Sequence, residues 1–289
     1  MTTIQTLIDR TPAGAGTLLS PELHHLYDGD LRFPESPANR PYVIGNFVST
    51  LDGIISFAVP GMAGGGEISG NDSTDRFIMG LLRASADAVM VGSGTLHATS
   101  PKHLWIADSV YAGAKELYAA YRKDVLGKSE RPYNVIVTGS GALDLNRRLF
   151  QSGEAPVRIL TTGRGAERLR STGSASLPNT EVLILDTSGG AIAPAAMVNA
   201  LYTTCGVRLL LHEGGPTLYG EFIAAGLVDE LFLTLAPQIA GSKPEQPRPT
   251  MVWGTEFLPG TAPWVRIVSA KQSGDHLYLR YARRDPAQI

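Results

Sequence analysis

Two acidic residues stand directly before glycines at the ends of apolar runs. Asp52 precedes Gly53, and Glu213 precedes Gly214 and Gly215. A carboxylate held at the end of a strand is suited to hydrogen bonding with a ligand or to moving a proton during a reaction. An acid before glycine also stabilises a turn, which is the structural interpretation. Both interpretations stay open for Asp52, whereas the chemical one is favoured for Glu213.

Three glycine-rich segments also follow apolar runs. They are Gly92-Ser93-Gly94-Thr95, Thr138-Gly139-Ser140-Gly141 and Glu213-Gly214-Gly215-Pro216-Thr217. Ligands of open α/β sheets bind beyond the carboxyl ends of strands, where glycine lets a phosphate approach the backbone. The third segment also precedes a predicted helix, whose first N–H groups are free to bind an anion. None of the three has the spacing G-x-G-x-x-G or G-x-x-x-x-G-K-[ST], which argues against Rossmann and P-loop sites.

The other reactive side chains carry weaker signals. His24 and His25 are adjacent but lack a third ligand, so we expect a surface position for them and no metal site. His212 ends an apolar run, which is typical of a core histidine. Cys205 is the single cysteine, so a disulfide within the chain and a cysteine-rich zinc site are excluded.

The composition is that of a globular protein. Of the 289 residues, 43% are hydrophobic and 18% are charged, and the formal net charge of −2 indicates neither a nucleic-acid nor a membrane surface. The first residues lack a basic region followed by an apolar run, and no stretch of about 18 apolar residues occurs. We therefore expect a cytoplasmic enzyme with no nucleic-acid or membrane partner.

Apolar runs and helical periods alternate along the chain. Strands are predicted near 42–50, 87–92, 133–138, 157–162, 181–186, 207–212 and 230–236. One helix is predicted to begin near 71–73, where cap candidates stand, and to present its apolar face at 77–82. Others are predicted near 110–126, 166–170, 194–203 and 216–225, although the polar stretch 163–178 is also compatible with a loop. This alternation predicts a mainly parallel sheet with helices on both faces. Two last runs, near 264–271 and 276–282, predict an antiparallel hairpin in a mixed α/β sheet.

One domain is expected over residues 41–289. No internal repeat or clear linker divides that stretch. Residues 1–40 form a lead-in segment, because they contain four prolines and show no clear period.

The short motifs, taken in order, resemble the pyrimidine reductase family of riboflavin biosynthesis, the C-terminal (RibD) domain of the deaminase–reductases. They are Thr50-Leu51-Asp52-Gly53, Ile68-Ser69-Gly70, Leu82-Arg83, the segment 87–95, Glu213-Gly214-Gly215-Pro216-Thr217-Leu218 and Gly226-Leu227-Val228-Asp229-Glu230-Leu231. Each motif is weak alone, but order and spacing match from about residue 41 to the end.

The resemblance implies a dihydrofolate-reductase-like fold and the cofactor NADPH. It also implies a pyrimidine substrate with a phosphoribosylamino group, as in the 5-amino-6-(5-phosphoribosylamino)uracil reductases. The sugar of this substrate receives hydride at C1′ and opens to a ribityl chain. Members of the family commonly form homodimers, and the segment 227–231 and the terminal hairpin offer apolar surface near a sheet edge. Asp52 is assigned to substrate activation near the nicotinamide and Glu213 to substrate hydrogen bonding, although the two roles could be exchanged.

The resemblance also suggests the residues that touch the ligands. Cofactor contacts are expected from Ser49, Gly92, Gly94, Thr95, Thr99, Ser140, Thr162, Arg164, Gly214, Gly215, Pro216, Thr217 and Leu218. Substrate contacts are expected from Ser69, Arg83, Lys102, His103 and Glu213. Arg83 is the first candidate for the sugar phosphate, and a salt bridge on the helix surface is its alternative role.

The chain departs from the family in two respects. The zinc deaminase half needs a Pro-Cys-x-x-Cys motif, which one cysteine cannot supply, so a separate deaminase is expected. Thr99 stands where the family has an acidic residue that touches the cofactor. Two other functions stay open on the same scaffold: reduction of dihydrofolate or another imine, and nucleotide binding without catalysis.

Overall fold

The computed structural model describes residues 3–12, 14, 16–59, 61–188 and 190–284. The strands of its main sheet are β1 (Gln5–Asp9), β2 (Tyr42–Ser49), β3 (Ala88–Gly92), β4 (Tyr133–Thr138), β5 (Val157–Thr161), β6 (Thr180–Ile184), β9 (Leu209–His212), β10 (Glu230–Leu235), β11 (Val265–Ser273) and β12 (His276–Arg283). A small separate hairpin joins β7 (Thr187–Ser188) to β8 (Ala191–Ile192).

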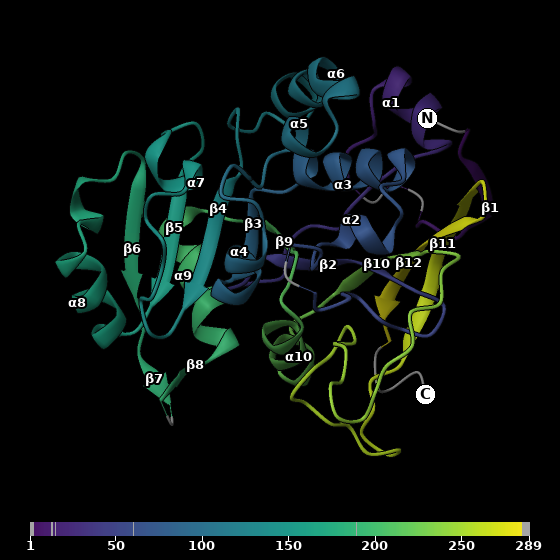
Figure 1. Cartoon of the computed structure of the whole chain (residues 1–289). Helices are drawn as coiled ribbons and strands as arrows, with labels where there is room; N and C mark the ends of the chain where they lie inside the picture. Colours follow the sequence, from purple (N-terminus) through teal and green to yellow (C-terminus); the bar gives the residue numbers. More distant parts are fainter. Residues whose placement is uncertain (1–2, 13, 15, 60, 189, 285–289) are drawn as a thin grey trace.

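The main sheet has ten strands in the order β1-β11-β12-β10-β2-β9-β3-β4-β5-β6 (Figure 1). From β10 to β6 every neighbouring pair is parallel. The pairs β10–β12, β12–β11 and β11–β1 are antiparallel. The predicted mixed sheet and its terminal antiparallel hairpin are confirmed.

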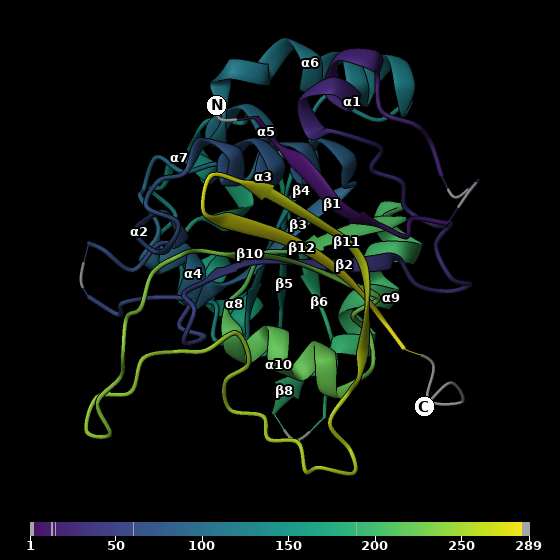
Figure 2. The same cartoon turned by 90° about the vertical axis from the view of Figure 1, so that its right-hand side faces the viewer.

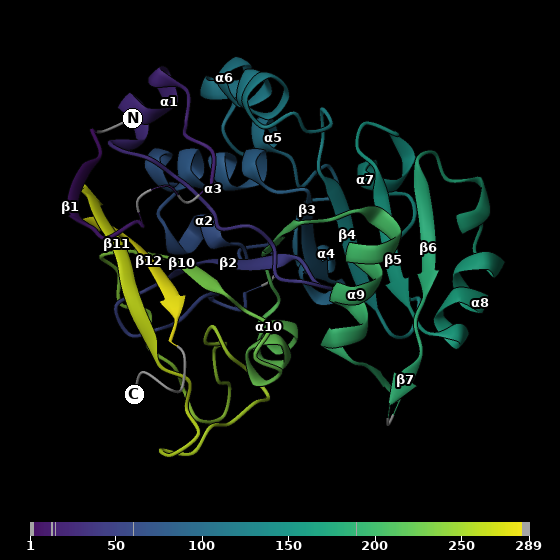
Figure 3. The ribbon, with the colours of Figure 1, turned by 180° about the vertical axis from the view of Figure 1, so that it is seen from behind.

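Helices cover both faces of the sheet, as predicted. They are α1 (Pro21–Tyr27), α2 (Gly65–Ile68), α3 (Ser73–Ser85), α4 (Ser93–Ala98), α5 (Ala107–Val110), α6 (Lys115–Ala120), α7 (Arg148–Gln151), α8 (Gly163–Ser171), α9 (Pro194–Cys205) and α10 (Pro216–Ala224), with short turns η1 (Ala112–Ala114), η2 (Tyr121–Val125) and η3 (Ser174–Ser176). Helices α3, α5 and α6 lie on one face, and α9 and α10 on the other (Figure 3).

Two apolar layers fill the space between the sheet and its helices. On one face, Phe77 and Leu81 of α3 are fully buried in the cluster that contains Ile44 of β2. On the other face, Phe222 of α10 and Leu201 of α9 are buried against neighbouring strands. Parallel strands are buried on both faces and therefore read as nearly continuous apolar runs, which is why the sequence located them.

The first forty residues contain two elements that the sequence pattern did not indicate. β1 pairs with β11 and forms one edge of the sheet, and α1 packs above it (Figure 2). Leu23 and Tyr27, one helical turn apart in α1, are buried in the same cluster as the helices that follow. β1 therefore covers the terminal hairpin, and β10 lies inside the sheet rather than at its edge.

Two helical regions differ in detail from the prediction. The polar stretch 163–178 is not a loop throughout: its first part forms α8, which Thr162 caps by accepting a hydrogen bond from the Gly165 N–H at 3.0 Å. The single helix predicted near 110–126 is divided into α5, η1, α6 and η2. Tyr111 and Ala114, at the joins, have extended or irregular backbone angles that interrupt the helical ladder.

Candidate active site

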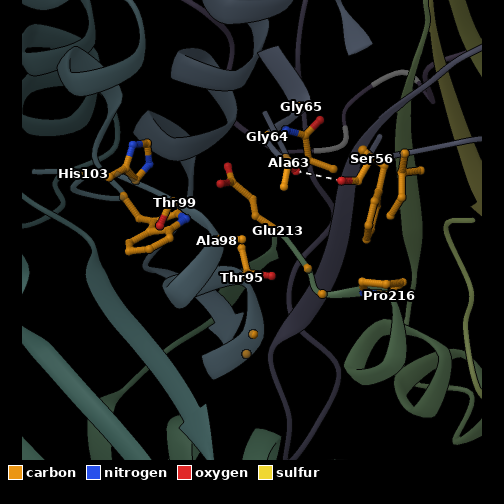
Figure 4. Close-up of a pocket in the computed structure, with 18 of the residues that line it drawn as sticks. Ser56, Ala63, Gly64, Gly65, Thr95, Ala98, Thr99, His103, Glu213 and Pro216 are labelled. Atoms are coloured by element: carbon orange, nitrogen blue, oxygen red, sulfur yellow. Dashed lines mark hydrogen bonds between the residues drawn. The ribbon is translucent and has the colours of Figure 1, made fainter. Parts of the chain in front are cut away.

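A cavity of about 1110 Å³ opens at the carboxyl ends of the parallel strands. Its walls come from the ends of β2, β3 and β4, from α3 and α4, from the loop before α2, and from the turn that joins β9 to α10. Figure 4 shows Glu213 projecting into it between Thr95 and Ala98 on one side and Ala63 and Gly64 on the other. Parallel strands bring all these ends to one edge, where open α/β sheets bind their ligands.

A buried ion pair forms part of the cavity wall. Arg83 donates from Nε to Glu213 Oε1 at 2.9 Å and from Nη2 to Oε2 at 2.7 Å. The two side chains are only 2% and 8% exposed, so this two-bond contact is held in a poorly hydrated place. The guanidinium is therefore committed to Glu213, while the carboxylate oxygens keep lone pairs that a ligand can use.

The rest of the Arg83 guanidinium is also engaged. Nη1 lies within hydrogen-bond distance of the carbonyls of Leu104 and Ile106 and of Ser109 Oγ. Nη2 lies 3.4 Å from His103 Nε2. Burial, and secondarily the charge of Arg83, lowers the pKa of His103 to about 3, so this histidine is neutral at physiological pH. Neither side chain is then a free cation for a phosphate.

Glycines form a second part of the wall. Gly92, Gly94, Gly139, Gly214 and Gly215 all line the cavity. An added Cβ at Gly94 or Gly139 would meet nothing within 4 Å, whereas one at Gly215 would lie 3.2 Å from Thr95 Oγ1. The glycines thus leave backbone accessible to a ligand.

The amino end of α10 faces this part of the cavity. Pro216, Thr217 and Leu218 form its first turn and line the wall. The first N–H groups of a helix have no partner inside the helix, and its dipole favours an anion there. A dinucleotide fits this region, because its pyrophosphate would find glycine backbone and a helix start together.

Asp52 lies outside this cavity. Its carboxylate is exposed and accepts hydrogen bonds from Thr50 Oγ1 at 2.5 Å and from the N–H groups of Ala240 and Gly241 at 3.1 and 2.6 Å. These contacts, that of Thr50 first, lower its pKa to about 2. The geometry is that of a residue that ties the turn after β2 to the segment after β10.

We therefore expect Asp52→Asn to change kcat by less than about tenfold, below the 10²–10⁴-fold loss of a missing general acid. The stabilising contribution of Asp52 should be complete above about pH 4 and fade as pH falls through its folded-state pKa of about 2. Steady-state kinetics and acid unfolding of both proteins measure these effects. A kcat loss of a hundredfold or more, with the fold intact, would show that Asp52 has a catalytic role.

Most of the predicted contact residues line the cavity. Those that do are Ser69, Arg83, Gly92, Gly94, Thr95, Thr99, His103, Glu213, Gly214, Gly215, Pro216, Thr217 and Leu218. The structure does not bring the others to the wall: they are Ser49, Asp52, Lys102, Ser140, Thr162 and Arg164. Their predicted ligand contacts stay predictions.

The outlying residues have other positions or contacts. Thr162 Oγ1 caps α8 and donates to the carbonyl of Gly139 at 2.8 Å. Ser140, Arg164 and Lys102 are exposed. No interaction within the described parts of the chain fixes the place of Arg164, so its predicted role toward the cofactor ribose rests on the sequence alone.

Several wall residues were not identified from the sequence. Asn46 of β2 lines the cavity, as do Asp75, Arg76 and Met79 of α3. Asp75, Met79 and Arg83 are spaced by four residues, which places them on one face of the helix. The predicted contact of Arg83 was therefore a usable signal for its neighbours one and two turns earlier.

His212 is a core histidine, as the sequence indicated. It is fully buried, and its ring packs edge-on against Tyr219 and Phe222 at centroid distances of 5.2 and 5.0 Å. Nδ1 accepts a hydrogen bond from the Gly214 N–H at 3.2 Å. Burial lowers its pKa to about 3, so a neutral ring supports the glycine turn from behind.

The described residues contain neither a cluster suited to a metal ion nor a helix suited to a membrane. No group of three or more histidine, cysteine, aspartate or glutamate side chains is arranged to hold a metal ion in that part of the chain. No helix there has the length and apolar character needed to cross a bilayer.

Sequence comparisons relate the chain to known proteins. A family model described as the RibD C-terminal domain matches residues 41–276. A protein of Archaeoglobus fulgidus named 2,5-diamino-6-ribosylamino-4(3H)-pyrimidinone 5′-phosphate reductase is 28% identical over 219 residues, which are 76% of this chain and 89% of that protein. A protein of the same name from Methanothermobacter thermautotrophicus is 29% identical over 205 residues, 71% of this chain and 81% of that protein.

Solved structures share the fold. RibD of Acinetobacter baumannii, form 1, has a TM-score of 0.63 and 21% identity, and the match covers 86% of this chain but 59% of that one. A pyrimidine reductase-like protein of Corynebacterium diphtheriae also has a TM-score of 0.63 and 21% identity, and the match covers 86% of this chain and 94% of that one. The chain thus spans about three fifths of the first protein and nearly all of the second.

Proposed function

The chain belongs to the RibD C-terminal domain family, whose model matches residues 41–276, and from this we propose that it is a nicotinamide-dependent reductase of riboflavin biosynthesis. It transfers hydride to C1′ of a pyrimidine that carries a phosphoribosylamino group. The observation that carries the proposal is that one cavity is lined both by the glycine turn before α10 and by the buried ion pair of Arg83 and Glu213. Hydride transfer requires cofactor and substrate to share such a space.

NADPH is the proposed cofactor, and it supplies the hydride when bound. The pyrophosphate is assigned to Gly214, Gly215 and the first turn of α10, with Thr95 opposite them. The N–H groups of Thr217 and Leu218 are the donors that this assignment uses. Preference for the 2′-phosphorylated form is assigned to the Ser140 hydroxyl and the Arg164 guanidinium, two of the three residues that the sequence suggested; the hydroxyl of the third, Thr162, is engaged with Gly139 and Gly165.

The proposed substrate is 2,5-diamino-6-ribosylamino-4(3H)-pyrimidinone 5′-phosphate. The two sequence relatives carry that name, and this chain covers most of their length. Glu213 is assigned to hydrogen bonding with the substrate through the lone pairs that Arg83 leaves free. The phosphate is assigned to Arg76, an exposed wall residue that forms no ion pair within the described residues, because Arg83 is committed to Glu213.

A side-by-side assay tests this function. The purified protein is given NADPH or NADH with the 2,5-diamino compound, with its deaminated counterpart 5-amino-6-(5-phosphoribosylamino)uracil, or with dihydrofolate. We expect oxidation of NADPH with the first substrate at the highest kcat/KM. Preference for dihydrofolate would make the protein another reductase on this scaffold. Failure to bind either nicotinamide cofactor would exclude a reductase.

A homodimer and a cytoplasmic location complete the proposal. The dimer is supported by large apolar side chains that stay exposed around the segment before β11, including Leu258 and Trp264. Light scattering at micromolar concentration should give twice the chain mass of 30.8 kDa. A mass near that of one chain would remove this part of the proposal.

A further inference from the structure

Asp75 is a buried carboxyl at the cavity that the assignments above leave without a role. It lies in the first turn of α3, is 6% exposed and lines the wall. The hydroxyls of Ser69, directly after α2, and of Thr234 of β10 interact with this carboxyl. No lysine or arginine forms an ion pair with it among the described residues, in contrast to Glu213.

The reduction needs a proton as well as a hydride. When the ribosylamino ring opens, the C1′–O4′ bond breaks with its electron pair going to O4′, while the nitrogen lone pair forms a C1′=N iminium. O4′ must gain a proton to become a hydroxyl. Hydride then adds to C1′, and the iminium nitrogen becomes a neutral amine. Substrate, hydride and one proton thus give the ribitylamino product.

We propose that Asp75 is the catalytic acid of this reaction, and that it donates the proton to O4′ as the ring opens. The inference rests on the proposed function. After donation, the carboxylate that remains lies beside the cationic iminium and stabilises it until hydride arrives. A proton from solvent then restores the acid.

Asp52, Glu213 and His103 are less suited to this step. Asp52 lies outside the cavity and its carboxylate is exposed and ionised. Glu213 accepts a hydrogen bond from the Arg83 guanidinium at each of its two oxygens, so both oxygens are already engaged. His103 has a pKa of about 3 and so carries no second proton at neutral pH. Asp75 is a buried acid that forms no ion pair with a lysine or arginine among the described residues.

The surroundings keep Asp75 protonated to unusually high pH. Burial is the largest cause and raises its pKa to about 6, and the negative charge of Asp72 adds to this. Hydrogen bonds from Thr234 and Ser69 and the charge of His276 act in the opposite direction. The other charged side chains that line the cavity are Glu67, Arg76, Arg83, Glu213 and Glu221.

The role of Asp75 as a proton donor predicts how kcat depends on pH. The acid form is the active one, so kcat should be constant below about pH 6 and fall about tenfold per pH unit above it. Asp75→Asn keeps the shape and the hydrogen bonds but has no proton to donate. We expect kcat to fall about 10²–10⁴-fold and NADPH affinity to stay within about twofold. The limb near pH 6, which is the decline of kcat above that pH, should vanish.

Asp72→Asn is the matched variant. It makes the same chemical change three residues away, and asparagine still caps α3 and accepts from Tyr278, as Asp72 does. It removes the negative charge that raises the pKa of Asp75. The limb should therefore move to lower pH while kcat at pH 5 stays close to that of the parent. An unmoved limb, or a parent-like kcat in Asp75→Asn, overturns the proposal.

Titration without substrate separates this inference from the proposed function. Carboxyl ¹³C NMR of aspartate-labelled protein should show one aspartate titrating near pH 6, absent from folded Asp75→Asn. If the parent reduces the pyrimidine but that resonance titrates near pH 4, Asp75 is not the acid and the function stands. If the resonance titrates near pH 6 but no pyrimidine is reduced, the function fails and the catalytic role falls with it.

Discussion

Replacing Arg83 with methionine is expected to lower the free energy of unfolding by about 3–5 kcal/mol, the usual cost of removing one partner of a buried ion pair. Methionine fills much of the space, so the loss comes chiefly from the Glu213 carboxylate, which stays 8% exposed without its two donors. The carbonyls of Leu104 and Ile106 also lose a donor. Urea unfolding followed by circular dichroism measures the change.

A double-mutant cycle controls this experiment. Glu213→Gln removes the charge that Arg83→Met leaves buried, so the double variant should be more stable than Arg83→Met alone, with a coupling energy above about 1 kcal/mol. In activity assays, Arg83→Met should change KM for the substrate with the 5′-phosphate and for the substrate without it by the same factor. A stability loss below about 1 kcal/mol, joined to a KM increase confined to the phosphorylated substrate, would instead show that Arg83 binds the phosphate directly.

Gly215→Val is expected to weaken NADPH binding about 100-fold or more. The first added carbon already lies 3.2 Å from Thr95 Oγ1, and the two further methyl groups would occupy the space assigned to the pyrophosphate. Loss of two hydrogen bonds to a charged group costs about 3–6 kcal/mol, and each 1.4 kcal/mol is a factor of ten. Fluorescence titration of NADPH measures the affinity.

The matched control for this change is Gly260→Val. Gly260 is exposed, has no heavy atom within 4 Å of an added Cβ, and lies outside the cavity. The substitution Gly260→Val makes the same chemical change without obstructing the turn at Gly214 and Gly215, so NADPH affinity should stay at the parent value. Equal affinities in the two variants would mean that the pyrophosphate binds elsewhere.

The central part of the fold was predictable because its signals are local. β4 is buried along nearly its whole length, so its segment 133–138 contains the apolar run Val135-Ile136-Val137 and the strand appears where expected. β1 gave no such signal. It is a five-residue edge strand whose exposure alternates, and its partner β11 lies at the other end of the chain. Edge pairing of that kind depends on tertiary contacts that no local pattern records.

The candidate site was predictable where it lies at strand ends. Glu213 and its glycines follow β9 directly, so sequence order alone placed them at the carboxyl edge. The partner of Glu213 was not predictable, since Arg83 is 130 residues away and its alternative role was a surface salt bridge. Asp75 was missed for a related reason: it interacts with Thr234 of β10, which is far away in the sequence, and its burial is a tertiary feature that no local pattern records.

The pairing of β1 with β11 also sets the order in which the molecule can be assembled. Lys271 of β11 donates to Thr6 of β1 across 265 residues of sequence. At a synthesis rate of about 5–20 residues per second, the first strand waits roughly 10–50 s for its partner to leave the ribosome. The central strand β2 waits about two thirds as long, because its neighbours are β9 and β10. Folding of the sheet is therefore largely a post-translational event, and its contacts, distant in sequence, predict a slow one.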